Sequence, residues 1–193
     1  DLELSDGFEY LVDDPDTQAI LLYVEGLKDL SRFKAAAIQA RAIGKPVVVV
    51  KAGRTDAGAA MANSHTGSLT GSYQAFEALC ESLGIVVTDQ PDTAVFCADA
   101  LARWGAPKAG GVAVASGSGG AAALVADAIN DNSLRAARLS DLAVEYLSEH
   151  QPLVKDTANV DFGAYFRAFD PAVMDQTLEV FANEPDVGAM LLV

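Results

Sequence analysis

The chain has 193 residues, of which 51% are hydrophobic, enough for one full domain and part of another. No apolar run approaches the roughly 20 residues of a membrane helix, and no basic region precedes an apolar stretch at the start, so we expect neither a membrane span nor a signal peptide. The formal net charge of −14, with no basic stripe, argues against nucleic-acid binding, and the two cysteines are predicted to be buried free thiols, which fits a reducing cytoplasm.

Strand-like and helix-like segments alternate along the first 106 residues. Strands are predicted at 19–24, 47–50 and 85–87, and helices at 30–43, 72–83 and 91–104, with the end of an earlier helix at 7–13. The four consecutive valines at 47–50 are typical of a strand buried on both faces, which indicates a parallel sheet covered by helices. A loop rich in Gly, Ser and Thr is expected over 53–71.

The Gly- and Pro-containing stretch 105–111 indicates a linker, after which the same alternation begins again. Strands are predicted at 112–115, 134–138, 158–162 and 189–193, and helices at 121–130, 140–149 and 171–182. The whole pattern predicts an α/β protein with doubly wound parallel sheets, arranged as two tandem units.

An internal similarity connects the two halves. Residues 15–22 resemble residues 185–192, each with a Pro-Asp pair before an apolar strand, although chance similarity is an alternative. If the units correspond, the first lacks its opening strand and the second stops in mid-sheet. Both would then leave open sheet edges, so the sequence predicts a fragment of a longer polypeptide.

The first candidate site is the histidine in the 53–71 loop. His65 lies among small polar residues and glycine, namely Ser64, Thr66, Gly67 and Ser68. Glycine allows close backbone approach and a helix N-terminus offers free N–H groups, so a phosphoryl group carried on His65 would be well held there. A flexible turn with an incidental histidine is the alternative.

Two further loops follow predicted strands. Glu25 comes directly after the first strand, where its carboxylate could accept an imidazole N–H and orient the ring, or could simply be solvated. Ser118, Gly119 and Gly120 form a second candidate phosphate cradle, although no lysine follows them as in a phosphate loop. The His and Cys residues have no zinc spacing, so no metal site is expected.

Several segments together resemble one family. Residues 45–54 and 64–69 look like the phosphohistidine segment of NDP-forming acyl-CoA synthetases, which are relatives of succinyl-CoA synthetase, and residues 21–26 are similar to the strand and glutamate before it. Residues 112–120 resemble the opening of the family's next flavodoxin-like domain. Residues 158–161 resemble a later Asn-Pro-Val-Asp element, but lack its proline.

The resemblance implies flavodoxin-like or Rossmann-like three-layer domains, at 1–106 with the phosphohistidine loop and at 107–193 with a truncated C-terminus. It implies an acid–CoA ligase that relays phosphate between an acyl phosphate and a nucleotide. His65 would carry the phosphoryl group and Glu25 would orient it. The residues expected around the phosphate are Ser64, Thr66, Gly67, Ser68, Ser118, Gly119 and Gly120.

The resemblance also implies CoA, ATP or ADP, and Mg as cofactors, with the nucleotide and most CoA contacts outside this chain. The expected partners are a small carboxylic acid or acyl-CoA, and CoA-binding and ATP-grasp domains in cis or in another subunit; a homo-oligomer is an option. Two alternatives stay open. One is the catalytically inactive, synthetase-like sensor region of a protein acetyltransferase; such regions have lost the histidine, so the presence of His65 and Glu25 argues against it. The other is a non-catalytic flavodoxin-like binding module.

Overall fold

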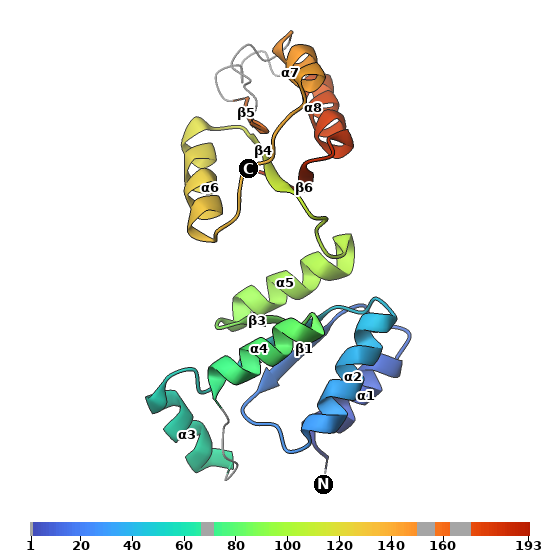
Figure 1. The fold of residues 1–193 in the computed structure, drawn as a ribbon, viewed down its shortest axis with the longest axis vertical. Helices are drawn as coiled ribbons and strands as arrows, with labels where there is room; N and C mark the ends of the chain where they lie inside the picture. The colour runs from blue at the N-terminus through green and yellow to red at the C-terminus, as the bar shows by residue number, and fades with distance from the viewer. Residues whose placement is uncertain (1, 67–71, 150–156, 163–170) are drawn as a thin grey trace. The chain divides into compact units, whose positions relative to one another are not determined.

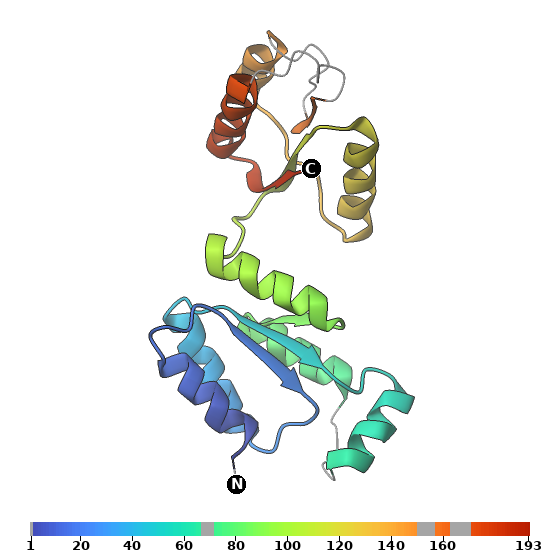
Figure 2. The same ribbon diagram turned by 180° about the vertical axis from the view of Figure 1, so that it is seen from behind.

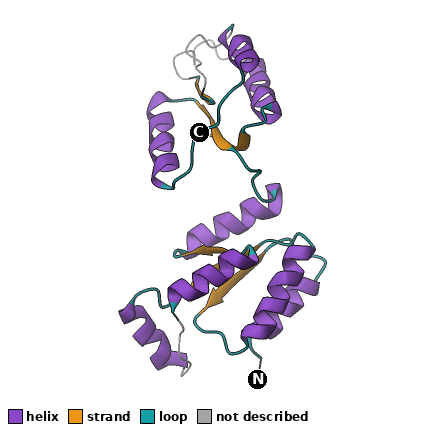
Figure 3. Cartoon of the chain, in the orientation of Figure 1, coloured by secondary structure: helices purple, strands orange, loops and turns teal. Residues whose placement is uncertain are grey.

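The computed structural model describes residues 2–66, 72–149, 157–162 and 171–193, with the backbone alone for 62–66. The chain divides into two compact units, Asp1–Ala106 (unit 1) and Pro107–Val193 (unit 2). Each unit contains a three-stranded parallel sheet with helices beside it (Figure 3). The prediction of an α/β fold with parallel sheets is therefore confirmed.

The sheet of unit 1 is built around the valine run. Its strands are β1 (Ile20–Val24), β2 (Val47–Lys51) and β3 (Val86–Thr88), in the order β1-β2-β3. All five residues of β2 are buried, because this central strand has a neighbour at each edge and helices over each face.

Helices cover both faces of this sheet. They are α1 (Leu4–Asp13), α2 (Leu30–Ala42), α4 (Tyr73–Leu83) and α5 (Pro91–Trp104). One apolar cluster joins Val47 and Val49 to phenylalanines of α1, α2 and α4, whereas Val48 and Val50 pack with Ala94 of α5. Alternate residues of β2 thus face α1, α2 and α4 on one side and α5 on the other (Figures 1 and 2).

The expected loop over 53–71 is wrong in part, because residues 56–66 form a helix, α3 (Asp56–Thr66). The Thr55 hydroxyl accepts a hydrogen bond from the Gly58 N–H at 3.2 Å and caps the first turn. Asp56 adds negative charge there, and the alanines that follow are strong helix formers. Both views draw α3 beside the sheet and not over either face (Figures 1 and 2).

Unit 2 repeats the architecture with the strand order β5-β4-β6. Its elements are β4 (Gly111–Ser116), α6 (Gly119–Asp131), α7 (Asp141–Ser148), β5 (Asn159–Asp161), α8 (Pro171–Asn183) and β6 (Val187–Leu192). Val112 and Val114 pack with α6, whereas Ala113 and Ala115 share a cluster with residues of α7 and α8. The central strand again has helices over both faces.

The predicted strand at 134–138 is wrong as a continuous strand. Two isolated bridges occur there instead, a parallel one between Val112 and Ala136 and an antiparallel one between Arg138 and Thr157. Ala137 is fully buried between them and its backbone bonds to Val112, so the segment is held against β4 without joining the ladder. Among the described residues, no helix has the length and apolar character needed to cross a membrane.

Candidate functional site

The carboxyl ends of β1 and β2 meet at one edge of the unit 1 sheet. Val24 pairs with Lys51, so Glu25 and Ala52, the next residues of the two strands, leave the sheet side by side. Ligands of open parallel sheets bind beyond this edge. Glu25 therefore lies at the edge where the sequence predicts the phosphate chemistry.

Lys51 ties these two strand ends together. Its ammonium group donates hydrogen bonds to the carbonyl oxygens of Glu25, at 2.8 Å, and Ala52, at 2.5 Å. It also lies 5.8 Å from the centre of the Phe76 ring, on α4. Burial lowers the pKa of Lys51, and the nearby negative charge of Glu25 offsets part of this change. Sequence reasoning missed this residue, although a lysine that ends a fully apolar strand is a signal.

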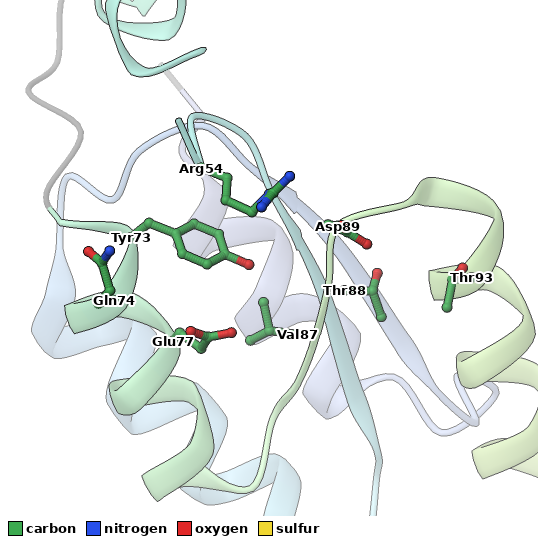
Figure 4. Close-up of a pocket in the computed structure, with 8 residues that line it drawn as sticks. All are labelled: Arg54, Tyr73, Gln74, Glu77, Val87, Thr88, Asp89 and Thr93. Carbon is green, nitrogen blue, oxygen red and sulfur yellow. The ribbon is translucent and has the colours of Figure 1, made fainter. Parts of the chain in front are cut away.

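A second feature of the same edge is an open pocket of about 610 Å³ beside β3. Figure 4 shows the side chains of Tyr73 and Glu77 pointing from α4 toward Val87 on β3, with Arg54 next to them. Burial raises the pKa of the Tyr73 hydroxyl, and in its protonated form this group can donate a hydrogen bond. The residues lining the pocket are Arg54, Tyr73, Gln74, Glu77, Val87, Thr88, Asp89 and Thr93. This lining can hydrogen-bond a polar molecule of mixed charge.

His65 lies, by its backbone, in the last turn of α3. The side chains of Ser64, His65 and Thr66, and the whole of Gly67 and Ser68, fall outside the described residues. The C-terminal end of a helix favours a cation such as imidazolium and disfavours a phosphate dianion. The next helix N-terminus along the chain is that of α4, which begins at Tyr73 after its Ser72 cap.

The remaining predicted residues lie in unit 2, beyond the carboxyl end of β4. The Ser118 hydroxyl accepts a hydrogen bond from the Ala121 N–H at 3.5 Å, and Gly119 and Gly120 open α6. Ser116 is fully buried, and its hydroxyl donates to the Ser118 carbonyl oxygen at 2.7 Å. These hydrogen bonds hold the loop in place, and the loop leads into a helix N-terminus, which is a feature of anion sites.

A carboxylate already lies close to this helix N-terminus. A Cβ atom added at Gly119 would come within 2.7 Å of Asp161 Oδ2, so the absence of a side chain lets the carboxylate approach. Asp161 ends β5 and pairs with Ser116 in register. Its negative charge opposes a second anion there, which the sequence analysis did not anticipate for this loop.

No group of three or more His, Cys, Asp or Glu side chains in the described part of the chain could hold a metal ion. The two cysteines are free thiols, Cys80 buried and Cys97 half-buried.

Two α/β units, each with a parallel sheet whose central strand has helices over both faces, define the class of flavodoxin-like domains. A family model described as "succinyl-CoA ligase like flavodoxin domain" matches residues 1–101. The chain belongs to this family, as the resemblance of the sequence predicted.

Individual relatives agree with the family. The alpha subunit of acetate–CoA ligase [ADP-forming] II from Pyrococcus furiosus is 34% identical over 100% of this chain and 41% of its own length. Acetate–CoA ligase [ADP-forming] I from Archaeoglobus fulgidus is 37% identical over 78% of this chain and 22% of its own length.

A solved structure of the dinucleotide-forming acetyl-coenzyme A synthetase 1 of Ca. Korarchaeum cryptofilum, in complex with phosphate and ADP, matches with a TM-score of 0.83 and 26% identity. The match covers 100% of this chain and 41% of that one. The chain therefore spans about two-fifths or less of the length of these relatives.

Proposed function

We propose that this chain is the phosphohistidine-bearing part of an ADP-forming acid–CoA ligase that acts in the cytoplasm. The observation that carries the proposal is the position of Glu25. It follows β1 at the carboxyl edge of the sheet, beside the end of β2 that leads into α3 and His65. Relatives named as ADP-forming acetate–CoA ligases support the same reaction class.

The overall reaction converts acyl-CoA, phosphate and ADP into the free acid, CoA and ATP, and is reversible. Phosphate first displaces CoA from the thioester and forms an acyl phosphate. An imidazole nitrogen of His65 then attacks the phosphorus, the bond from phosphorus to the acyl oxygen breaks, and the acid leaves as its carboxylate. ADP finally takes the phosphoryl group from His65.

Glu25 has a positioning role in this scheme. A carboxylate that accepts the N–H of one imidazole nitrogen fixes the tautomer and leaves the other nitrogen free as nucleophile. Lys51 holds the backbone carbonyl of Glu25 and thereby the turn that carries its side chain. Such preorganisation supports transfer because the groups do not need to rearrange during the reaction.

The phosphoryl group is proposed to lie among small polar residues and glycines from two segments. These are Ser64, Thr66, Gly67 and Ser68 next to His65, and the Ser118–Gly120 loop. Because Asp161 lies close to Gly119, its ionised carboxylate would repel the phosphoryl group. The Ser118–Gly120 loop should therefore bind this group less strongly than the residues around His65 do. The nucleotide, its Mg and most CoA contacts belong to CoA-binding and ATP-grasp domains beyond this chain, in cis or in another subunit.

The test is phosphorylation of the full-length protein with its nucleotide-binding part. Labelled ATP is expected to leave an acid-labile, base-stable phosphate, which His65→Ala abolishes. Glu25→Gln is expected to slow labelling about 10- to 100-fold, because the ring loses its oriented tautomer.

His150 is the matched control, since it is the only other histidine of the chain. His150→Ala should label as the wild type does. Retained base-stable label on the His65→Ala protein, or label that is stable to acid, would exclude the proposed carrier.

A further inference from the structure

The open pocket of about 610 Å³ beside β3 takes no part in the proposed phosphoryl transfer. Tyr73 and Glu77 line it from α4, where they lie one turn apart. Arg54 lies beyond the end of β2, and Asp89 directly follows β3. In Figure 4 the Tyr73 ring points from α4 toward β3, with Arg54 on one side of it and Glu77 on the other. The pocket thus brings together charged side chains from three elements of unit 1.

The charged groups of this pocket lie near one hydroxyl group but are not paired with each other. Burial is the main cause that raises the pKa of Tyr73, and the charges of Arg54 and of both carboxylates also act on this hydroxyl. Among the described residues, none of these three charged side chains forms an ion pair. Opposite charges that line one pocket without touching leave room for a molecule between them.

The charges of the pocket determine which molecule matches it. Arg54 offers a planar set of N–H donors that suits a carboxylate, whereas Glu77 and Asp89 accept hydrogen bonds from cationic groups. A molecule with one carboxylate and two cationic groups therefore meets each charge with its opposite. The free amino acids lysine, arginine and ornithine carry these three groups at neutral pH. A neutral amino acid would leave one carboxylate of the pocket unmatched, and an acidic one would add a repulsion.

The rest of the lining suits the uncharged part of such a molecule. Val87 and the Tyr73 ring supply apolar surface for an aliphatic chain. Gln74, Thr88 and Thr93 add side chains that can donate or accept hydrogen bonds.

We propose that this pocket binds a free basic amino acid such as lysine. The carboxylate of the ligand lies at Arg54, and its two cationic groups lie at Glu77 and Asp89. Its aliphatic chain crosses the pocket over Val87. The proposal goes beyond the phosphoryl transfer described above, since this binding needs neither His65 nor a nucleotide.

Binding to the full-length protein tests the match of charges. Ligand-observed NMR titrations compare L-lysine, L-glutamine and L-glutamate, which have similar lengths and differ in side-chain charge. We expect lysine to bind about three- to tenfold more tightly than glutamine, because it forms one further ion pair in an open site. Glutamate should bind most weakly. Equal affinities for the three amino acids would overturn the proposal.

Two substitutions test the proposed contacts. Arg54→Gln should weaken lysine binding about three- to tenfold. It should not weaken binding of 1,5-diaminopentane, which is lysine without its carboxylate. Glu77→Gln should weaken binding of both molecules. Glu81→Gln and Arg103→Gln are the matched controls, since both residues are exposed in unit 1 and neither lines the pocket.

The net charge of −14 makes a general attraction of cations the main alternative explanation for lysine binding. Arg54→Gln distinguishes the two explanations by the direction of its effect. The substitution makes the protein more negative, so a general attraction would strengthen lysine binding, whereas the proposed site loses the partner of the carboxylate. Lysine binding to Arg54→Gln that equals or exceeds binding to the wild type would therefore overturn the proposal.

Two further results would also overturn it. One is a wild-type protein that does not bind lysine at millimolar concentrations. The other is a loss of lysine binding in Glu81→Gln as large as that in Glu77→Gln. Arg54 and Glu77 are both exposed, so their variants should keep the wild-type urea midpoint, and this measurement shows that lost binding does not come from unfolding.

Discussion

Lys51 occupies a costly position, because an ammonium group loses most of its hydration when it is buried. Two backbone carbonyl oxygens and the face of the Phe76 ring replace part of the lost water. The result is one cationic group that joins β1, β2 and α4 at the carboxyl edge of the sheet. A leucine in its place would pack well but would leave those carbonyls without a charged donor.

Cys80 gives a pH-dependent prediction. The thiol is fully buried on α4, and burial raises its pKa from 9.0 to about 11. Between these values the unfolded chain loses the proton and the folded chain keeps it, so stability should fall as the pH rises from 9 to 11. The loss amounts to at most about 3 kcal/mol, since one pKa unit corresponds to about 1.4 kcal/mol.

Urea unfolding at several pH values checks this prediction. In Cys80→Ala the free energy of unfolding should decrease less between pH 9 and 11 than in the wild type. Any loss of stability from the cavity left by the missing thiol should be equal at every pH. Cys97→Ala should keep the wild-type slope. Equal slopes in all three proteins would mean that the thiol titrates at its ordinary value.

The sequence predicted those residues of the candidate site that directly follow a strand. Glu25 and Ser118 both follow an apolar run, and parallel strands bring such residues to one edge of each sheet. Lys51 and Asp161 were not assigned roles, because their significance comes from burial and from a close approach to Gly119 that depend on tertiary packing. The assignment of His65 stays a prediction.

At the scale of elements, α3 shows how composition misled. Glycine, serine and threonine at the ends of 53–71 are typical of loops, but the centre of this segment is rich in alanine. The Thr55 hydroxyl caps the first turn and thereby favours a helix there. The strand at 134–138 failed for another reason, since ladder formation depends on a partner that hydropathy does not reveal.

Residues 15–22 and 185–192, which are similar in sequence, occupy corresponding places in the two units. The aspartates of the two segments, however, make different hydrogen bonds. In both units the Pro-Asp pair follows a helix and leads into an edge strand. Asp186 accepts two hydrogen bonds from the Arg135 guanidinium, both at 2.6 Å, and one from the Arg138 N–H at 2.8 Å. Asp16, in contrast, is exposed and contacts Asp14 through its backbone N–H.

Because Asp186, unlike Asp16, binds an arginine side chain, we expect Asp186→Asn and Asp16→Asn to change the stability of the protein by different amounts. The hydrogen bonds from Arg135 and Arg138 lower the pKa of Asp186. Its contribution to stability is therefore present above the ordinary value of about 4 and is lost as the pH falls through the lowered pKa. Asp186→Asn should lower the urea midpoint at pH 7, and the difference from the wild type should narrow in acid.

Asp16→Asn is the control for that experiment and should change the midpoint at pH 7 much less, because it breaks no contact with an arginine. The measurement is urea unfolding of both variants and the wild type at pH 7 and in acid. An Asp186→Asn difference that stays constant as the pH falls would show that the carboxylate charge is not its source.

For the whole molecule, the alternation of strands and helices was predictable from the spacing of apolar residues along the chain. This spacing is a property of the sequence and does not depend on tertiary contacts. The relatives named above are more than twice as long as this chain. The described residues supply a sheet edge with Glu25, the buried ammonium group of Lys51 and an open polar pocket. The other domains of the proposed ligase must bring the nucleotide to it.

Each apolar cluster among the described residues draws its buried members from one unit. Phe33 packs against the rings of Phe8 and Phe76 in unit 1, at centroid distances of 5.4 and 6.2 Å. Phe181 is equally buried in the core of unit 2. Since the cores share no residue, we expect each unit to open without the other, and each Phe→Ala change to cost about 3–5 kcal/mol in its own unit.

Hydrogen exchange on the intact protein measures this independence. Phe33→Ala should speed exchange of the β2 amides and leave β4 as in the wild type, whereas Phe181→Ala should do the reverse. The two variants control each other, because the same ring is removed from equally buried positions. If either change speeds exchange in both sheets alike, the two units unfold as one cooperative body and the expectation of independent opening is wrong.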